Sequence, residues 1–142
     1  MANDVVNDFA RSMGIATSGL RAQAGRMRVI SENIANADST ASTSGGEPYR
    51  RKVPTFSSEL DRTLDAKVVS LGKILPDSSA FRVKHEPGNP AADAAGNVRY
   101  PNVNPLIEMT DMRDAQRSYE ANLNIISATR RMIQRTLDIL KA

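Results

Sequence analysis

The chain has 142 residues, the size of one domain, and 19 Lys and Arg against 16 Asp and Glu give it only a small positive excess. It contains no Cys and one His, which excludes a thiol nucleophile, a disulfide framework and a Cys/His-rich zinc site. Leu, Ile, Val and Phe supply only 30 of the 142 residues, so the chain has little apolar surface for a core of its own.

The first eight residues, MANDVVND, carry acidic side chains where a secretory signal would carry positive charge. No long apolar run follows them. We therefore expect neither a cleaved signal peptide nor a transmembrane helix.

Residues 1–38 contain apolar side chains in two series, each with a spacing of seven and the second offset from the first by three. This spacing is the a/d pattern of a coiled-coil seam and predicts one long N-terminal helix. The seam residues on this helix are Val6, Phe9, Met13, Leu20, Met27, Ile30 and Ile34.

Residues 39–105 form the middle segment, and all seven prolines lie between Pro48 and Pro105. Because proline breaks helices, this segment is expected to be rich in loops. The alternation in residues 81–86 predicts a strand, with residues 67–75 as its hairpin partner across a turn at 76–79. Residues 98–100 are a candidate short strand, and residues 57–65 a candidate short helix.

Residues 106–142 repeat the heptad pattern and predict a second long helix. Asn104 is its expected N-cap and Pro105 its first helical residue, and the acidic Glu108, Asp111 and Asp114 suit the positive end of the helix dipole. Its seam residues are Met112, Tyr119, Leu123, Ile126, Ile133, Leu137 and Leu140.

The predicted fold class is therefore mainly α, an antiparallel coiled coil of the two terminal helices with a small loop-rich β-hairpin module between them. The heptads of the two helices register when the numbers of facing residues total about 146. Gly14, Gly19 and Gly25 interrupt the first helix, either weakening it until it packs against a neighbour or permitting close contact between helices.

A second apolar row lies well outside the seam of each helix. One interpretation is a broad core face with scattered surface residues. The other is burial by further subunits in a larger assembly. The rows are Ile15, Ala22 and Val29 on the first helix, and Ile125, Met132 and Ile139 on the second.

No catalytic, cofactor or metal site is predicted. His85 has no nucleophile pattern near it, and the acidic residues after Pro105 match dipole compensation better than a carboxylate site. The basic stretches at 49–52 and 130–131 are short, which favours solvated faces or protein contacts over nucleic-acid or membrane binding.

Residues 31–40, SENIANADST, resemble the signature of bacterial flagellar rod and hook proteins, with Asn33 and Asn36 one turn apart at the helix end. Residues 48–53, 100–105 and 117–124 look like the corresponding segments of the proximal-rod members of that family. A different axial flagellar subunit and a basic coiled-coil binder of nucleic acid or membrane surfaces remain as alternatives.

The resemblance implies a non-enzymatic structural subunit of the basal-body rod, exported without cleavage through the flagellar type III apparatus and assembled in the periplasm. The implied partners are copies of itself, other rod proteins, a rod-base adaptor and the inner-membrane ring, with no nucleic acid, cofactor or small-molecule substrate. The candidate subunit contacts come from the motif at 31–40, the basic stretch at 49–52 and the second apolar rows of the two helices. They are Asn33, Asn36, Tyr49, Arg50, Arg51, Ile15, Val29, Ile125, Met132 and Ile139.

Overall fold

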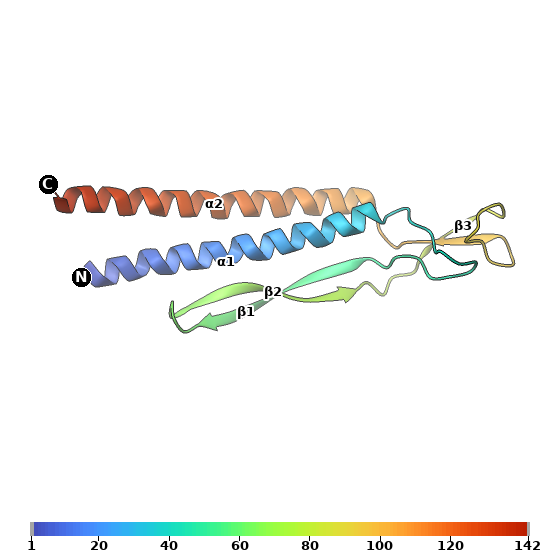
Figure 1. Cartoon of the computed structure of the whole chain (residues 1–142), viewed down its shortest axis with the longest axis horizontal. Helices are drawn as coiled ribbons and strands as arrows, with labels where there is room; N and C mark the ends of the chain where they lie inside the picture. Colours follow the sequence, from blue (N-terminus) through green and yellow to red (C-terminus); the bar gives the residue numbers. More distant parts are fainter. Residues whose placement is uncertain (1, 142) are drawn as a thin grey trace. The chain divides into compact units, whose positions relative to one another are not determined.

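The computed structural model describes residues 2–141, with side chains described from residue 7 to residue 139. The element order is α1 (Ala2–Ala35), β1 (Lys52–Asp61), β2 (Ala66–Pro76), β3 (Arg82–His85), β4 (Asn97–Tyr100) and α2 (Pro105–Lys141) (Figure 1). Both predicted long helices are present, and the short strand expected at 98–100 is β4. No helix within residues 2–141 combines the length and the hydropathy that crossing a bilayer requires.

The predicted fold class, mainly α, is wrong. Among the described residues, 29 lie in strands beside 71 in helices, so the fold is a mixture of α and β structure. The strands form two separate two-stranded sheets, β1 with β2 and β3 with β4.

The pairing of the strands also differs from the prediction. Residues 57–61, expected in a short helix, belong to strand β1, and β2 pairs with β1 instead of with β3. Leu60 and Leu64 are spaced as on a helix face, but pairing of β1 with β2 overrides this local pattern. The turn between β1 and β2 holds Asp65 at a φ of 46°, a left-handed conformation that Asp tolerates well.

The chain divides into two compact units, and each takes residues from both long helices and from the β1–β2 hairpin. Unit 1 comprises Met1–Arg26, Phe56–Gly72 and Asp114–Ala142, and unit 2 comprises Met27–Thr55 and Lys73–Arg113. The two units are described separately below.

In unit 1, α1 contacts α2 on one face and the β1–β2 hairpin on another. A Cβ atom added to Gly19 would lie 2.8 Å from Asn122 Nδ2, and one added to Gly25 would lie 2.7 Å from a methyl carbon of Leu71. Gly14 faces Leu64 even more closely. These glycines therefore permit close contact with α2 and with the hairpin, the second of the two roles considered for them.

In unit 2, β3 and β4 are antiparallel, with Arg82 opposite Tyr100 and His85 opposite Asn97. Val98 of β4 and Val103, in the segment that follows it, are both buried. Arg82 Nη2 donates a hydrogen bond to the carbonyl of Ala37 (2.7 Å), and this bond ties the hairpin to the end of α1. Asn104 Oδ1 accepts the N–H of Leu106 (3.1 Å), which confirms Asn104 as the N-cap of α2.

The register between the helices differs from the expected one by five residues. Gly19 faces Asn122 within unit 1 and Asn33 faces Glu108 within unit 2, so facing residue numbers total 141 instead of about 146. Ala115 and Thr129, which continue the seven-residue spacing of Glu108 and Asn122, are both buried. The buried strip of α2 therefore consists of small and polar residues, which an apolar heptad pattern does not detect.

Candidate functional site

The most completely bonded polar group in unit 2 is the side-chain amide of Asn33, near the end of α1. Its Nδ2 donates to the carbonyl of Lys52 (2.8 Å) and to Glu108 Oε2 (3.0 Å). Its Oδ1 accepts from the hydroxyl of Tyr49 (2.8 Å) and from the N–H of Lys52 (2.9 Å). The side chain is fully buried, and every hydrogen-bonding position of the amide is used.

Arg51 and Glu108 complete this arrangement, which we call the Asn33 cluster: Asn33, Tyr49, Arg51, Lys52 and Glu108. Arg51 Nε donates to Glu108 Oε1 (2.6 Å), and the Glu108 carboxylate is buried. A buried carboxylate is stable only when it is paired and hydrogen-bonded, and here Arg51 and Asn33 supply both requirements. The cluster thereby joins the end of α1, the start of β1 and the first turn of α2.

Further contacts fix the Arg51 guanidinium and backbone. Nη1 lies 3.3 Å from Asp77 Oδ2 and Nη2 lies 3.7 Å from Asp111 Oδ2. The N–H of Arg51 donates to Asn102 Oδ1 (2.8 Å). Segments 49–52, 77–79 and 102–111 are therefore held together around one arginine.

The electrostatics of the cluster favour a charged Arg51 and a neutral Tyr49. Burial opposes the charge of Arg51, but hydrogen bonds to Glu108 and Asp77 outweigh it and raise the pKa of the guanidinium. Hydrogen bonds from Ser79 and, to a smaller extent, Arg51 lower the pKa of Asp77. Burial raises the pKa of the Tyr49 phenol, so the neutral hydroxyl that donates to Asn33 is the favoured form.

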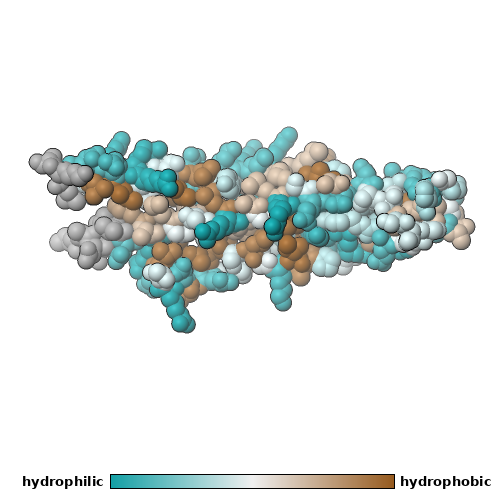
Figure 2. Space-filling model, viewed as in Figure 1, coloured by the Kyte–Doolittle hydropathy of each residue, from teal (hydrophilic) through white to brown (hydrophobic). Residues whose placement is uncertain are grey.

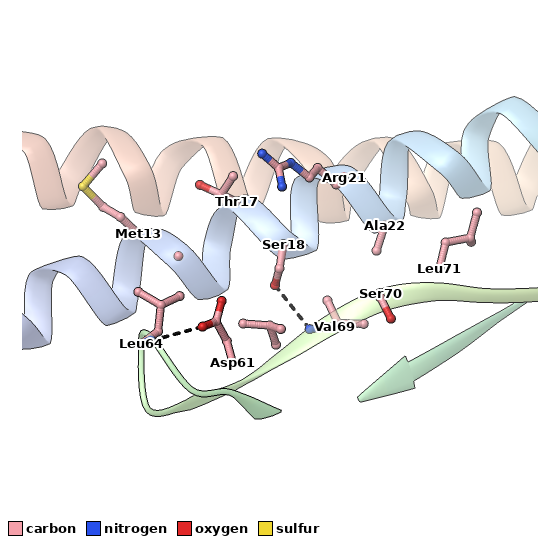
Figure 3. A pocket seen from close by; sticks show the side chains of 12 residues that line it. Met13, Thr17, Ser18, Arg21, Ala22, Asp61, Leu64, Val69, Ser70 and Leu71 are labelled. Carbon is pink, nitrogen blue, oxygen red and sulfur yellow. Dashed lines mark hydrogen bonds between the residues drawn. The ribbon is translucent and has the colours of Figure 1, made fainter. Parts of the chain in front are cut away.

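Unit 1 contains a pocket between α1 and the β1–β2 hairpin, shown in Figure 3. Met13, Leu64 and Leu71 line it together with the polar ends of Arg21 and Asp61. The N–H of Val69 donates to Ser18 Oγ (3.3 Å), and Asp61 Oδ1 caps the turn after β1 through the N–H of Leu64 (3.2 Å). Ser18, Asp61 and Ser70 are thus engaged in the chain's own structure. No group of three or more metal-ligating side chains occurs among the described residues.

The polar residues proposed as subunit contacts occupy different surroundings. Asn33 lies inside unit 2, while Asn36 is half-buried and its Nδ2 donates back to the carbonyl of Glu32 (2.8 Å). Arg50 stacks on the ring of Phe81 at 4.1 Å from its centroid and donates to the carbonyl of Asp77 (3.0 Å). Tyr49 and Arg51 belong to the Asn33 cluster.

The apolar candidates for subunit contacts also divide into two groups. Val29 is buried in unit 2 and Ala22 is buried in unit 1, where it lines the pocket against the hairpin. Ile15 is exposed. The row on α2 is exposed throughout, with Ile125 at 46%, Met132 at 48% and Ile139 at 76%.

The residues of the predicted seam differ widely in burial. Ile30 is buried, Leu123 and Leu137 are exposed, and the side chains of Val6 and Leu140 fall outside the described residues. The half-buried seam residues are Phe9, Met13, Leu20, Met27, Ile34, Met112, Tyr119, Ile126 and Ile133.

Sequence reasoning missed two residues of this site, Lys52 and Asn102, and it missed the buried role of Glu108. Glu108 was interpreted as compensation for the helix dipole, because three acidic residues at that end satisfy that pattern equally well. The available signal was its seven-residue spacing from Ala115, Asn122 and Thr129, which marks it as the first residue of the buried strip.

Two family comparisons match separate parts of the chain. The family described as "Flagella basal body rod protein" matches residues 13–41, which include α1 from Met13 and Asn33. The family described as "Flagellar basal body rod FlgEFG protein C-terminal" matches residues 94–139, which include β4 and most of α2. The class of protein is therefore a rod subunit of the bacterial flagellar basal body.

Individual relatives narrow the class. The chain is 54% identical to the flagellar basal-body rod protein FlgC of Agrobacterium fabrum over 90% of the chain and 92% of that protein. It is 40% identical to FlgC of Bacillus subtilis, over 92% of the chain and 97% of that protein, and 36% identical to FlgC of Salmonella typhimurium, over 88% and 92%. The chain belongs to the FlgC family of flagellar basal-body rod proteins.

The functional class follows from the family. The chain is a structural subunit of the flagellar basal-body rod, it resides in the basal body, and it assembles with other basal-body components. The Asn33 cluster and the exposed row on α2 are therefore features of an assembling structural protein.

Proposed function

We propose that the chain is a subunit of the proximal rod that self-assembles into the helical drive-shaft tube and packs against the other rod proteins. The exposed apolar row of α2 carries this proposal. Ile125, Met132 and Ile139 form a line on one helix, each 46% exposed or more. Removing such a surface from water stabilises an assembly by about 25 cal/mol per Å² of apolar area.

The apolar row on α1 is mostly buried within the chain. The row on α2 is exposed, so it is the one that needs a partner from outside the chain. Ala22 and Val29 on α1 are already covered within their own units. On the face shown in Figure 2, hydrophobic residues stand among hydrophilic ones. We therefore assign the contact between subunits to α2 first, with Ile15 as a smaller contribution from α1.

The Asn33 cluster supports the same proposal because it gives the subunit mechanical rigidity. A rod that transmits torque needs subunits whose helices do not shear apart, and bonds among buried charged and polar groups resist such movement. In unit 2, Asn33, Arg51 and Glu108 tie α1, β1 and α2 to one another. The proposed activity is assembly and load transmission, without enzymatic chemistry.

The proposal also includes the export route of the chain and its individual partners. We expect export without signal cleavage through the flagellar type III apparatus and assembly in the periplasmic space. We expect contacts with copies of the chain, other rod proteins, the rod-base adaptor and the inner-membrane ring, and none with nucleic acid or a small-molecule substrate.

Deletion of the gene followed by electron microscopy of basal bodies tests the proposal. We expect basal bodies without rods and non-motile cells, whereas motile cells with intact rods would overturn the proposal. Met132→Asp places a charge in the exposed row and is expected to block rod formation. Ser127→Asp, at an exposed position of the same helix outside the row, is the matched control and is expected to assemble.

A further inference from the structure

The part of the β1–β2 hairpin that belongs to unit 1 has one open edge. β2 runs alongside α1 (Figure 3), where the N–H of Val69 donates to Ser18 Oγ (3.3 Å) and residues 68–71 line the pocket against the helix. From β1, Asp61 is the one residue among those that line this pocket. Residues 56–60 of β1, which we call the β1 edge, are all exposed. Since the sheet has two strands among the described residues, β1 is left as its open side.

The sequence of the β1 edge offers little protection against pairing with another strand. Natural edge strands are usually blocked by proline, lysine or a bulge. Residues 56–60, FSSEL, contain neither proline nor lysine, and Pro54 lies outside the segment. A sheet of two strands is also only marginally stable by itself and gains stability when further strands are added. The β1 edge is therefore a surface suited to another extended strand.

The side chains of the β1 edge divide between the two faces of the sheet. Ser57 Oγ lies 2.8 Å from Ser70 Oγ, and Ser70 Oγ donates to Glu59 Oε1 (3.3 Å). Ser57 and Glu59 therefore share one face. Because successive residues of a strand point to opposite faces, Phe56 and Leu60 share the other. Phe56 is 44% exposed and Leu60 is 61% exposed, so an apolar pair is left uncovered with one small hydroxyl side chain between its members.

We propose that the β1 edges of two copies of the chain pair antiparallel around a two-fold axis at Ser58. In this register Ser58 lies opposite Ser58 of the second copy, and Phe56 of each copy lies opposite Leu60 of the other. A cross-strand pair of an aromatic and an aliphatic side chain stabilises a sheet, and the two-fold axis supplies this pair twice. The two hairpins then form one continuous sheet of four strands.

Neighbouring registers of the two strands are less favourable. A shift of two residues in one direction places each Phe56 opposite a serine, and the same shift in the other direction places Glu59 opposite Glu59. A shift of one residue brings the outward backbone groups of one strand against groups of the other that point toward its own β2. Parallel pairing in register also places Glu59 beside Glu59. The sequence therefore selects the antiparallel register centred on Ser58.

The proposed contact is isologous, so it closes after two copies. Copies related by a two-fold axis point in opposite directions, whereas copies in the proposed helical tube all point the same way. The dimer is therefore a form of the chain outside the rod, and it must separate before its copies are added. One paired strand is a small interface, so we expect a weak dimer whose population depends on concentration. This inference goes beyond the proposed rod function and does not rest on it.

Because the chain contains no Cys, a single introduced cysteine can form a disulfide only between two copies. Ser58→Cys is purified in reduced form, oxidised, and separated under denaturing conditions without reductant. Residues directly opposite each other in an antiparallel pair have Cα atoms about 4.5–5.5 Å apart, a distance that a disulfide spans. We therefore expect rapid formation of a disulfide-linked dimer.

Two further single-cysteine variants separate the register from random collision. In the proposed pairing the two Ser57 residues lie diagonally, about 7–8 Å apart, which is too far for a disulfide. Ser127→Cys places a thiol at an exposed position of α2. Each rate is divided by the rate at which the same thiol reacts with a small soluble disulfide, which corrects for thiol reactivity. We expect Ser58→Cys to form the linked dimer roughly tenfold faster than Ser57→Cys or Ser127→Cys.

A second substitution tests the apolar pairs. Leu60→Asp, added to Ser58→Cys, removes both contacts with Phe56 and should slow dimer formation by roughly tenfold. Val83→Asp is the matched control, since Val83 is 60% exposed on β3, and it should leave the rate unchanged. Both substituted positions are exposed, and far-UV circular dichroism checks that each variant is folded.

The outcomes that overturn the pairing are distinct from those that overturn the rod function. Equal corrected rates for the three single-cysteine variants, or a faster rate for Ser57→Cys than for Ser58→Cys, would overturn the pairing. Equal effects of Leu60→Asp and Val83→Asp would likewise contradict it. None of these results touches the rod function, which gene deletion and microscopy of basal bodies test separately.

Discussion

The side-chain amide of Asn33 binds both backbone groups of Lys52, donating to its carbonyl (2.8 Å) and accepting from its N–H (2.9 Å). A residue in a neighbouring strand offers the same pair of bonds. Asn33 thus acts as a short extension of the sheet at the first residue of β1, although it lies on a helix. This pairing fixes where the chain enters β1 after the loop that follows α1.

Replacement of Asn33 tests the importance of this pairing. Asn33→Ala removes the partners of buried backbone and side-chain groups, and we expect it to lower the free energy of unfolding by roughly 2–4 kcal/mol. Urea unfolding of the purified chain measures the loss. Asn36→Ala, which removes one side-chain bond to Glu32, is the control and should cost about 1 kcal/mol. Equal losses at the two positions would contradict a special role for Asn33.

The ion pair between Arg51 and Glu108 should be strongly coupled. Its Nε to Oε1 distance is 2.6 Å and the carboxylate is buried, so removal of either partner leaves the other poorly compensated. A double-mutant cycle with Arg51→Met and Glu108→Gln should give a coupling energy of about 1.5–3 kcal/mol. The exposed pair Arg11–Asp65, at 3.0 Å, is the comparison and should give less than about 1 kcal/mol.

Alkaline pH should weaken the Asn33 cluster through Tyr49. Burial raises the pKa of Tyr49 above its ordinary 10.0, so its contribution to stability is complete below pH 10.0 and is lost as the pH rises through the raised value. Tyr49→Phe should lower stability by about 1 kcal/mol near neutral pH and remove this part of the alkaline loss.

Tyr100 must be separated from this effect, because its hydrogen bond to Glu86 also raises its pKa. Thermal unfolding is therefore followed from about pH 8 to pH 11 in a Tyr100→Phe background. Tyr49→Phe is then added to this background. If stability still falls as steeply above pH 10 as it does in the background alone, Tyr49 is not the titrating group.

Gly19 should tolerate no large side chain. A Cβ there would lie 2.8 Å from Asn122 Nδ2, so Gly19→Leu is expected to separate α1 from α2 locally and to lower the free energy of unfolding by about 1–3 kcal/mol. Ala24→Leu, at an exposed position of the same helix, should change it by less than about 0.5 kcal/mol. Far-UV circular dichroism during urea unfolding measures both, and a gain in stability for Gly19→Leu would contradict the close contact.

Local sequence patterns were sufficient for the two helices. Asn104 and Pro105 marked the start of α2 because a side-chain oxygen before the first turn and a fixed φ within it act within a few residues. The alternation of residues 98–100 likewise predicted β4. The segments around Asn33, Tyr49 and Tyr119 carried the family resemblance, which the relatives named FlgC confirm.

Only the tertiary structure decided how these parts are used. Residues 57–61 are a strand because β2 pairs with them, and β2 in turn covers the face of α1 that carries Ala22. Glu108 is buried because Arg51 and Asn33, distant in sequence, meet its charge. Helix caps and heptads depend on neighbours a few residues away, whereas strand pairing and the burial of a charge depend on partners that folding brings together.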